Sequence, residues 1–268
     1  MNDGFVAGRA LVTAIEQANV NAFPSDRLHL DGAWLVRLSP GNPARRVNSL
    51  NIHNPADGAG VPARLAAARA HFARNGVPFH LRVTPLTPMQ VIDHADIRNW
   101  SREGETDVWT LSLAEGPVED ASQGIRVSDV PLDQWLEAFA ASGGTRAEAV
   151  TPQALASLGA ALSRVVGPRL CLVARDGAGQ VLGVAIAIVD GPLAGIYDVA
   201  VAPVARRRGL GRLLVRACLA RAWELGARTA WLQVTAENAP ARALYAGLGF
   251  TPLYTYHYRR PPEERGPA

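Results

Sequence analysis

The chain has no lysine, only two cysteines and no apolar run long enough to span a bilayer. All 27 basic residues are therefore arginine, and against 24 acidic residues they give a net charge of +3. So small a surplus argues against a nucleic-acid-binding protein, whose basic residues spread over a wide face among aromatics. We therefore expect no nucleic-acid partner.

The cysteines also point to a compartment. Cys171 and Cys218 are too few for a disulfide framework and neither belongs to a CxxC pair, so a reducing environment is expected. The most apolar stretch, 181–189, is too short for a membrane span, and residues 1–4 have neither the charge nor the apolarity of a signal peptide. These features predict a cytoplasmic protein with no membrane partner.

Apolar residues make up 48% of the 268 residues and charged residues 19%, which excludes a disordered chain. The length suits one large domain or two smaller ones. A polar stretch with proline and glycine runs from Glu115 to Gly124 and is typical of a linker. We therefore predict two domains, residues 1–120 and 125–268.

Hydrophobic periodicity predicts a mixed α/β protein. The second domain should hold an antiparallel meander followed by a β-α-β-α-β run, which favours a mixed, mostly antiparallel sheet flanked by helices. The predicted helices cover 6–20, 63–73, 88–97, 132–139, from 152 onward, from 210 onward and 238–246, and the predicted strands cover 34–38, 47–52, 79–83, 108–113, 170–174, 181–189, 196–201, 230–234 and 250–258.

The most informative segment follows the strand that ends at Val201. It contains three successive arginines and two glycines before a helix, as Arg206-Arg207-Arg208-Gly209-Leu210-Gly211-Arg212. The first amides of a helix have no partner within the helix and, with its dipole, attract anions. Arginines at that end oppose the dipole, so stability does not explain them, whereas an anionic ligand does. The alternative is a solvated run of charge.

Two motifs together resemble the GNAT superfamily of acyl-CoA N-acyltransferases. Arg206-x-x-Gly209-x-Gly211 after a strand is similar to the pyrophosphate loop of that family. The segment from Asn238 through Tyr245 to Phe250 is similar to a later motif of the family, which lines the thioester end of the cofactor. The match covers residues 196–258.

The resemblance implies that acetyl-CoA is the co-substrate. Loop amides would hold its pyrophosphate, the strand end would pair with its pantetheine arm, and Tyr245 would protonate the departing thiolate. Asn238 serving only as a helix cap and Tyr245 serving only in the core are the alternatives. The expected cofactor-binding residues are Val199, Ala200, Val201, Arg206, Arg207, Arg208, Gly209, Leu210, Gly211, Arg212 and Asn238.

The attacking amine needs a base. Asp198, on the strand beside the expected thioester, is the first candidate, His257 the second, and Glu237 an alternative that equally suits a first-turn anion. No histidine has metal-ligand spacing, so no metal is expected. Tyr245 and Asp198 are thus the predicted catalytic residues.

The first domain resembles a degenerate GNAT-like half without the arginine-glycine loop, and the chain as a whole resembles a tandem duplication. Its segment 45–54 is unusually polar for a strand. Asn48, Asn51 and His53 would face a substrate groove in one interpretation. In the other, which we favour, they lie on an edge strand with a solvated face.

The predicted function is transfer of the acetyl group from acetyl-CoA to a primary amine of an unidentified acceptor, by direct attack in a ternary complex. Cys171 and Cys218 both fit core positions, so neither suggests a covalent intermediate. The alternatives are a longer acyl-CoA as donor, or an acyl-CoA sensor without turnover. A homodimer also fits the family.

Overall fold

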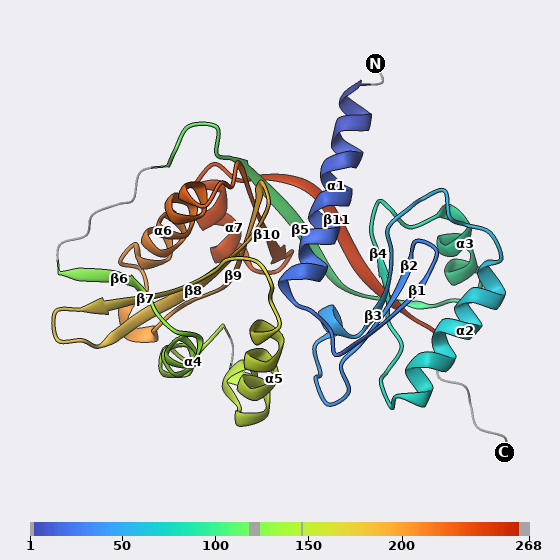
Figure 1. Ribbon diagram of the computed structural model, residues 1–268, viewed down its shortest axis with the longest axis horizontal. Coiled ribbons are helices and arrows are strands. Elements are labelled where there is room, and N and C mark those ends of the chain that lie inside the picture. The colour runs from blue at the N-terminus through green and yellow to red at the C-terminus, as the bar shows by residue number, and fades with distance from the viewer. Residues whose placement is uncertain (1–2, 118–123, 146, 263–268) are drawn as a thin grey trace. The chain divides into compact units, whose positions relative to one another are not determined.

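The computed structural model describes residues 3–117, 124–145 and 147–262 (Figure 1). The chain forms two compact units, each built from separate stretches of sequence. Unit 1 comprises Met1–Gln17, Ser25–Asp107 and Leu253–Ala268, and unit 2 comprises Ala18–Pro24 and Val108–Pro252. These units differ from the contiguous domains 1–120 and 125–268, and part of the expected linker, residues 118–123, lies outside the described residues.

Unit 1 holds a sheet with helices on it. Its strands follow the order β1-β2-β3-β4-β11, antiparallel except for the β3–β4 pair. Its elements are most of α1 (Asp3–Ala22), β1 (Arg27–Asp31), β2 (Trp34–Leu38), a 3-10 turn (Arg45–Val47), β3 (Ser49–Ile52), α2 (Val61–Arg74), β4 (Leu81–Val83), α3 (Met89–Ile97), the first part of β5 (Ser101–Ser112) and most of β11 (Thr251–Arg260).

The two faces of the unit 1 sheet differ in polarity. Because side chains alternate along a strand, Leu50 and Leu81 fall on one face, within an apolar cluster that includes Leu65 and Phe72 of α2. Arg82, next to Leu81, turns to the other face and is paired there with Glu16 of α1. Unit 1 therefore buries charge as well as apolar surface.

Unit 2 holds the strand order β5-β10-β9-β8-β7-β6. Neighbouring pairs from β6 to β9 are antiparallel, and β9 runs parallel to β10. Its elements are the second part of β5, β6 (Ile125–Asp129), α4 (Leu132–Ala141), a 3-10 turn (Ala147–Val150), α5 (Pro152–Ser163), β7 (Arg169–Asp176), β8 (Val181–Asp190), β9 (Leu193–Val201), a 3-10 turn (Pro203–Ala205), α6 (Leu210–Glu224), β10 (Thr229–Thr235) and α7 (Ala239–Ala246).

Helix α6 packs along one face of strands β7–β9 and α4 packs on the other (Figure 1). The α6 side buries an entirely apolar cluster around residues such as Leu214 and Ala217. On the α4 side, Trp135 is fully buried and its Nε1 donates to the carbonyl of Ala185 at 3.0 Å. The expected α/β fold with a mostly antiparallel sheet flanked by helices is confirmed.

The order of elements occurs twice along the chain. Three antiparallel strands, a helix, a parallel strand, another helix and a last strand describe both β1–β5 and β7–β11. The last strand of each series leaves its own unit: β11 pairs with β4 in unit 1, and the end of β5 lies beside β10 in unit 2. This exchange explains why no single cut in the sequence separates the two units.

Most predicted elements are present, but three polar strands were missed. β1 is exposed at all five positions, and most residues in the first part of β5 are also exposed. β6 is exposed or half-buried throughout. The first part of β5 carries no hydrophobic alternation. β1 and the start of β6 do alternate apolar and polar residues, but each strand covers only five residues, so neither was recognised.

Candidate functional site

Strands β9 and β10 pair over only part of their length. Their parallel register runs from Leu193–Thr229 to Ile196–Leu232. Within the described residues, no pairing with β10 is recorded for the rest of β9, up to Val201. This is the separation expected at the thioester end of the site, where a peptide-like arm can add beside a strand.

The point of separation carries a β-bulge. Ile186 of β8 faces Tyr197, and Val184 faces Ala200, so that Asp198 and the next residue together oppose a single residue of β8. Asp198 has φ of +48°, a left-handed conformation that is uncommon for a residue with a side chain. Such strain persists where the surrounding structure enforces it and often marks functional sites. The bulge turns the backbone at the expected site of reaction.

The arginine-glycine loop ends in a left-handed glycine. Gly209 has φ of +80° and directly precedes α6, and Arg207 has φ of +65°. A Cβ added at Gly209 would meet no atom within 4 Å, so the space beside this backbone is open. The three arginines 206–208 are exposed around it. A helix N-terminus, open backbone and nearby cations together suit a phosphate group.

Two residues of the loop also hold the fold together. The Nε of Arg206 donates to the carbonyl of Val201 at 3.2 Å, and the pairing of Val201 with the pantetheine arm stays a prediction. Arg212 donates from Nη2 to the carbonyl of Gly247 at 2.7 Å and so links α6 to the end of α7. A Cβ at Gly211 would approach Leu244 to 3.1 Å, so this glycine permits close packing of the two helices.

The second motif places Asn238 at the start of α7. Its side-chain oxygen accepts from the amide of Ala241 at 3.2 Å, and the residue is exposed. This is the geometry of an N-cap, which was the alternative interpretation of Asn238. The N-cap hydrogen bond does not test whether Asn238 also contacts the cofactor, so that role stays a prediction.

Tyr245 lies on the buried side of the same helix, with 9% of its surface exposed. Burial, followed by the charges of Cys218 and Asp198, raises the pKa of Tyr245 to about 12. The phenol therefore keeps its proton throughout the neutral range. Asp198 is the last of the causes that raise this pKa, and both residues belong to unit 2; their joint role in catalysis stays a prediction.

The other candidate bases lie elsewhere. His257 belongs to β11, opposite Val83 in unit 1, and burial, then the charges of Arg102 and Arg259, lowers its pKa to about 4. Glu237 is exposed before α7, where its carbonyl accepts from the amide of Ala239. Neither His257 nor Glu237 is among the groups that shift the pKa of Tyr245, whereas Asp198 is.

Both cysteines are free and buried, which confirms their predicted core positions. In the described ranges, no three histidine, cysteine or acidic side chains gather as metal ligands. Among the helices of residues 3–117, 124–145 and 147–262, none combines the length and apolarity that a bilayer span requires.

The interpretation of segment 45–54 as a solvated edge strand is wrong. β3 lies between β2 and β4, and all four of its residues are buried. Asn48 fixes the preceding loop: its Oδ1 accepts from the amide of Ser39 at 2.7 Å and its Nδ2 donates to the carbonyl of Asn42 at 2.6 Å. Asn51 donates to Ser49, and the pKa of His53 is lowered by burial despite the charge of Glu16.

Sequence reasoning missed the buried ion pair beneath these residues. Arg82 donates to both carboxylate oxygens of Glu16, at 3.0 and 2.8 Å, and both side chains are almost fully buried. The hydroxyl of Tyr254 also donates to Glu16, at 2.5 Å, and the guanidinium of Arg82 lies 3.3 Å from the ring centroid of Tyr256. No local signal could reveal the pair, because its partners stand 66 residues apart.

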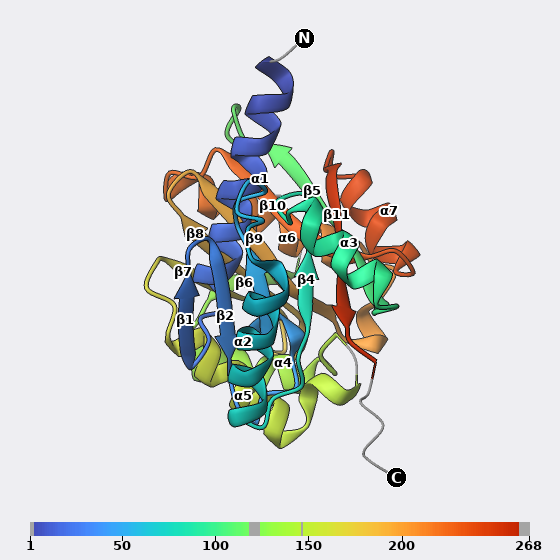
Figure 2. The same cartoon turned by 90° about the vertical axis from the view of Figure 1, so that its right-hand side faces the viewer.

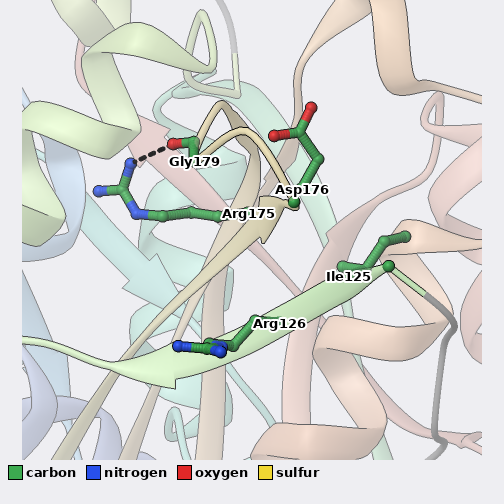
Figure 3. Close-up of a pocket in the computed structure, with 7 residues that line it drawn as sticks. Ile125, Arg126, Arg175, Asp176 and Gly179 are labelled. Atoms are coloured by element: carbon green, nitrogen blue, oxygen red, sulfur yellow. Dashed lines mark hydrogen bonds between the residues drawn. The ribbon is translucent and has the colours of Figure 1, made fainter.

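A cavity of about 480 Å³ lies at the β7–β8 turn (Figure 3). Arg126 and Arg175, which face each other across β6 and β7, line it together with Asp176. Asp176 accepts from the amides of Ala178 and Gln180 and so stabilises the turn. None of the predicted catalytic or cofactor-binding residues lines this cavity.

Comparison with known families matches residues 134–250 to the Acetyltransferase (GNAT) family. The chain is similar to ribosomal protein bS18-alanine N-acetyltransferase of Salmonella typhimurium, with 46% identity over 55 residues, which are 20% of this chain and 37% of that protein. It is also similar to streptothricin acetyltransferase of Streptomyces lavendulae, 47% identical over 55 residues, or 29% of that protein. The chain thus spans only 29% to 37% of the length of these two relatives.

Solved structures resemble nearly the whole chain. A GCN5-related N-acetyltransferase from Kribbella flavida has a TM-score of 0.70 and 19% identity, over 94% of this chain and 96% of the other. A tandem GNAT protein from the clavulanic acid biosynthesis pathway has a TM-score of 0.65 and 18% identity, over 95% and 88%. At these identities the likeness concerns the fold, including its duplication.

Proposed function

The chain contains a GNAT acetyltransferase domain and has the fold of that superfamily, and from this premise we propose that it transfers an acetyl group from acetyl-CoA to a primary amine in a ternary complex. Unit 2 is the catalytic part and unit 1 the degenerate half. The observation that supports the proposal is the open arginine-glycine loop before α6, in the same unit as Tyr245 and Asp198.

Acetyl-CoA binds along the end of β9 and the start of α6. The first amides of α6 and the exposed Arg206, Arg207 and Arg208 hold the pyrophosphate, which matches their charge. The pantetheine arm lies beside the unpaired end of β9, where the amides of Val199 and Val201, which alternate with the one that Ala200 turns toward β8, are its partners. The bulge at Asp198 directs this backbone toward the thioester carbonyl.

The reaction then needs two proton movements. The amine nitrogen bonds to the thioester carbon, the carbon–sulfur bond breaks, and the amine proton passes to Asp198. Tyr245 donates its hydroxyl proton, in a hydrogen bond or fully, to the departing thiolate. Because the pKa of Tyr245 is raised to about 12, a phenolate formed there recovers a proton from Asp198, which resets the site.

A panel of amine acceptors tests the proposed acetyltransferase activity. Purified full-length chain is mixed with acetyl-CoA and with amino acids, polyamines, aminoglycosides and peptides bearing a free N-terminus, and the released CoA thiol is followed. Thiol release with at least one amine, and faster with acetyl-CoA than with longer acyl-CoA donors, supports the proposal. Tight acetyl-CoA binding without turnover of any amine would instead favour a sensor, and absence of binding would overturn the family function.

The variant Tyr245→Phe tests whether Tyr245 is the general acid. We expect kcat to fall by roughly 10- to 100-fold with little change in the affinity for acetyl-CoA, since general acids contribute factors of this order. Because the pKa of Tyr245 is about 12, the wild-type rate should show no alkaline fall up to a pH of about 10, where an ordinary tyrosine would be half ionised. An unchanged kcat in Tyr245→Phe would remove Tyr245 from this role, whereas a wild-type rate that halves near that pH would contradict only its raised pKa.

A further inference from the structure

Strand β1 forms an exposed edge of the unit 1 sheet. Only β2 is paired with it in the described part of the chain, in a hairpin closed by Asp31 and Trp34. In an antiparallel pair, every second residue of an outer strand turns its backbone N–H and C=O groups away from its neighbour. A row of such groups is a template for another strand, and proteins normally protect it.

The two faces of β1 have different surroundings. Arg27, His29 and Asp31 face α2: Arg27 donates to the side chain of Asn75 at the end of that helix, and the ring of His29 lies 4.3 Å from that of His71. Asp31 accepts from an arginine of the same helix at 2.6 Å. Figure 2 shows α2 on the near side of β1 and β2.

The opposite face of β1 has no cover. Leu28 and Leu30 are 55% and 70% exposed, although leucine is normally buried. The other end strand, β6, is protected differently: it has no such pair of exposed apolar side chains, and the carbonyl of Val127 accepts a hydrogen bond from Arg221 at 3.0 Å. The exposed apolar pair on an unprotected edge therefore needs an explanation.

The sequence of β1 is complementary to itself. The segment can be aligned antiparallel with a second copy of itself, with His29 at the centre. Arg27 then lies opposite Asp31 of the other copy, and Leu28 lies opposite its Leu30. Opposite charges and apolar pairs at facing positions stabilise antiparallel strands. A twofold axis through the centre repeats every favourable pair, as a closed dimer requires.

We propose that the chain forms a homodimer by antiparallel pairing of β1 with β1 of a second copy. The pairing satisfies outward backbone groups, buries Leu28 and Leu30 against their counterparts, and brings Arg27 beside the Asp31 of the other copy, whose carboxylate it shares with Arg64. His29 lies opposite its own copy on the twofold axis. The dimer is independent of the proposed acetyl transfer, so neither proposal depends on the other.

The variant Leu30→Lys tests the interface, because a lysine on an edge strand opposes pairing. In sedimentation velocity of the full chain at micromolar concentrations, we expect a wild-type dimer and a dissociation constant raised about 100-fold in Leu30→Lys, since both copies lose a buried leucine. The matched control is Ile97→Lys on α3, where the isoleucine is 76% exposed in the same unit, and it should remain dimeric.

Three results would overturn the dimer. The wild-type chain could sediment as a monomer, as it would if the edge instead receives a peptide from another protein. Leu30→Lys could dimerise as well as the wild type. Ile97→Lys could weaken the dimer as strongly as Leu30→Lys, which would show that the apolar-to-lysine change acts without regard to β1.

A disulfide tests the register. In the proposed pairing, His29→Cys faces its own copy at a spacing that permits a disulfide, whereas Asp31→Cys faces residue 27 of the other copy. Mild oxidation should therefore link His29→Cys into a covalent dimer on a non-reducing gel and leave Asp31→Cys monomeric. The native Cys171 and Cys218 are buried and serve as internal controls in the wild type. Equal crosslinking of the two variants would contradict this register.

Discussion

Helices α6 and α2 occupy the same place in the two repeated series of elements, yet their N-termini differ in what surrounds them. Both helices follow a glycine in the left-handed conformation: Gly209 with φ of +80° before α6, and Gly60 with φ of +65° before α2. In each, the carbonyl of the glycine accepts from an amide in the first turn, at 3.1 Å. The backbone of the anion-binding turn is thus present in both units.

Side chains decide which turn can bind a ligand. Before α6 the arginines 206–208 are exposed, and Arg206 donates to a backbone carbonyl, that of Val201. Before α2, Asp57 supplies a carboxylate from within the chain, which accepts from Arg64 at 2.7 Å and from the amide of Ala33 at 2.9 Å. Unit 1 thus carries an anion of its own before α2, whereas unit 2 carries cations at the corresponding turn before α6. Unit 1 therefore has the same left-handed glycine turn as unit 2 but differs from it in the charges around the turn.

The largest effect should separate these two turns. Gly209→Glu places bulk and negative charge in the open turn of α6, and we expect at least a roughly 1,000-fold loss of acetyl-CoA affinity by calorimetry. The matched variant Gly60→Glu makes the same change before α2 and should leave that affinity unchanged, although the left-handed backbone costs stability. Equal affinities in both variants would show that the α6 turn is not the cofactor site.

A second contrast concerns the interiors. The apolar cluster of unit 2 beneath α6 contains no charged residue, whereas unit 1 buries the Glu16–Arg82 pair. Removing one member of a buried ion pair leaves the other uncompensated, so Glu16→Gln should lower the free energy of unfolding by about 3 kcal/mol. Chemical denaturation measures this. Cys218→Ala in the unit 2 core is the comparison variant, since it removes a buried side chain without leaving a charge unpaired.

The same pair predicts a pH dependence. Burial raises the pKa of Glu16, but the charge and hydrogen bonds of Arg82 outweigh it and lower the pKa below 4.5. A lowered pKa in the folded state stabilises the protein above the unfolded value, and that stability is lost as the pH falls through the folded value. Wild-type stability should therefore fall below a pH of about 4.5 more steeply than that of Glu16→Gln. Parallel pH profiles for the two proteins would contradict this assignment.

The smallest effect should come from the internal anion of unit 1. The hydrogen bond from Arg64, followed by that from Ala33, lowers the pKa of Asp57. Asp57→Asn keeps the shape and removes the charge, so we expect a loss of about 1 kcal/mol in unfolding free energy and no change in acetyl-CoA affinity. Thermal melts and calorimetry measure the two quantities. A changed affinity would mean that this turn takes part in cofactor binding after all.

The sequence predicted the parts of the site that lie close together in the chain. The strand, the arginine-glycine loop and α6 are contiguous, so composition and spacing were enough to place them. Asn238 and Tyr245 stand on one short helix, where the N-cap and the buried side follow from local pattern. The bulge at Asp198 left no mark in the sequence, because it depends on the register with β8.

What the sequence determined by itself is the class of elements and the basic, glycine-containing turn before α6, since both depend on neighbours along the chain, whereas the catalytic roles of Tyr245 and Asp198 stay predictions. Only the tertiary structure decided that β5 and β11 leave their own series, that β3 is an interior strand, and that Glu16 meets Arg82. These features depend on pairing between distant segments, which local periodicity does not encode. That β1 is an edge strand with exposed leucines belongs with them, because it depends on which strands and helices lie beside it.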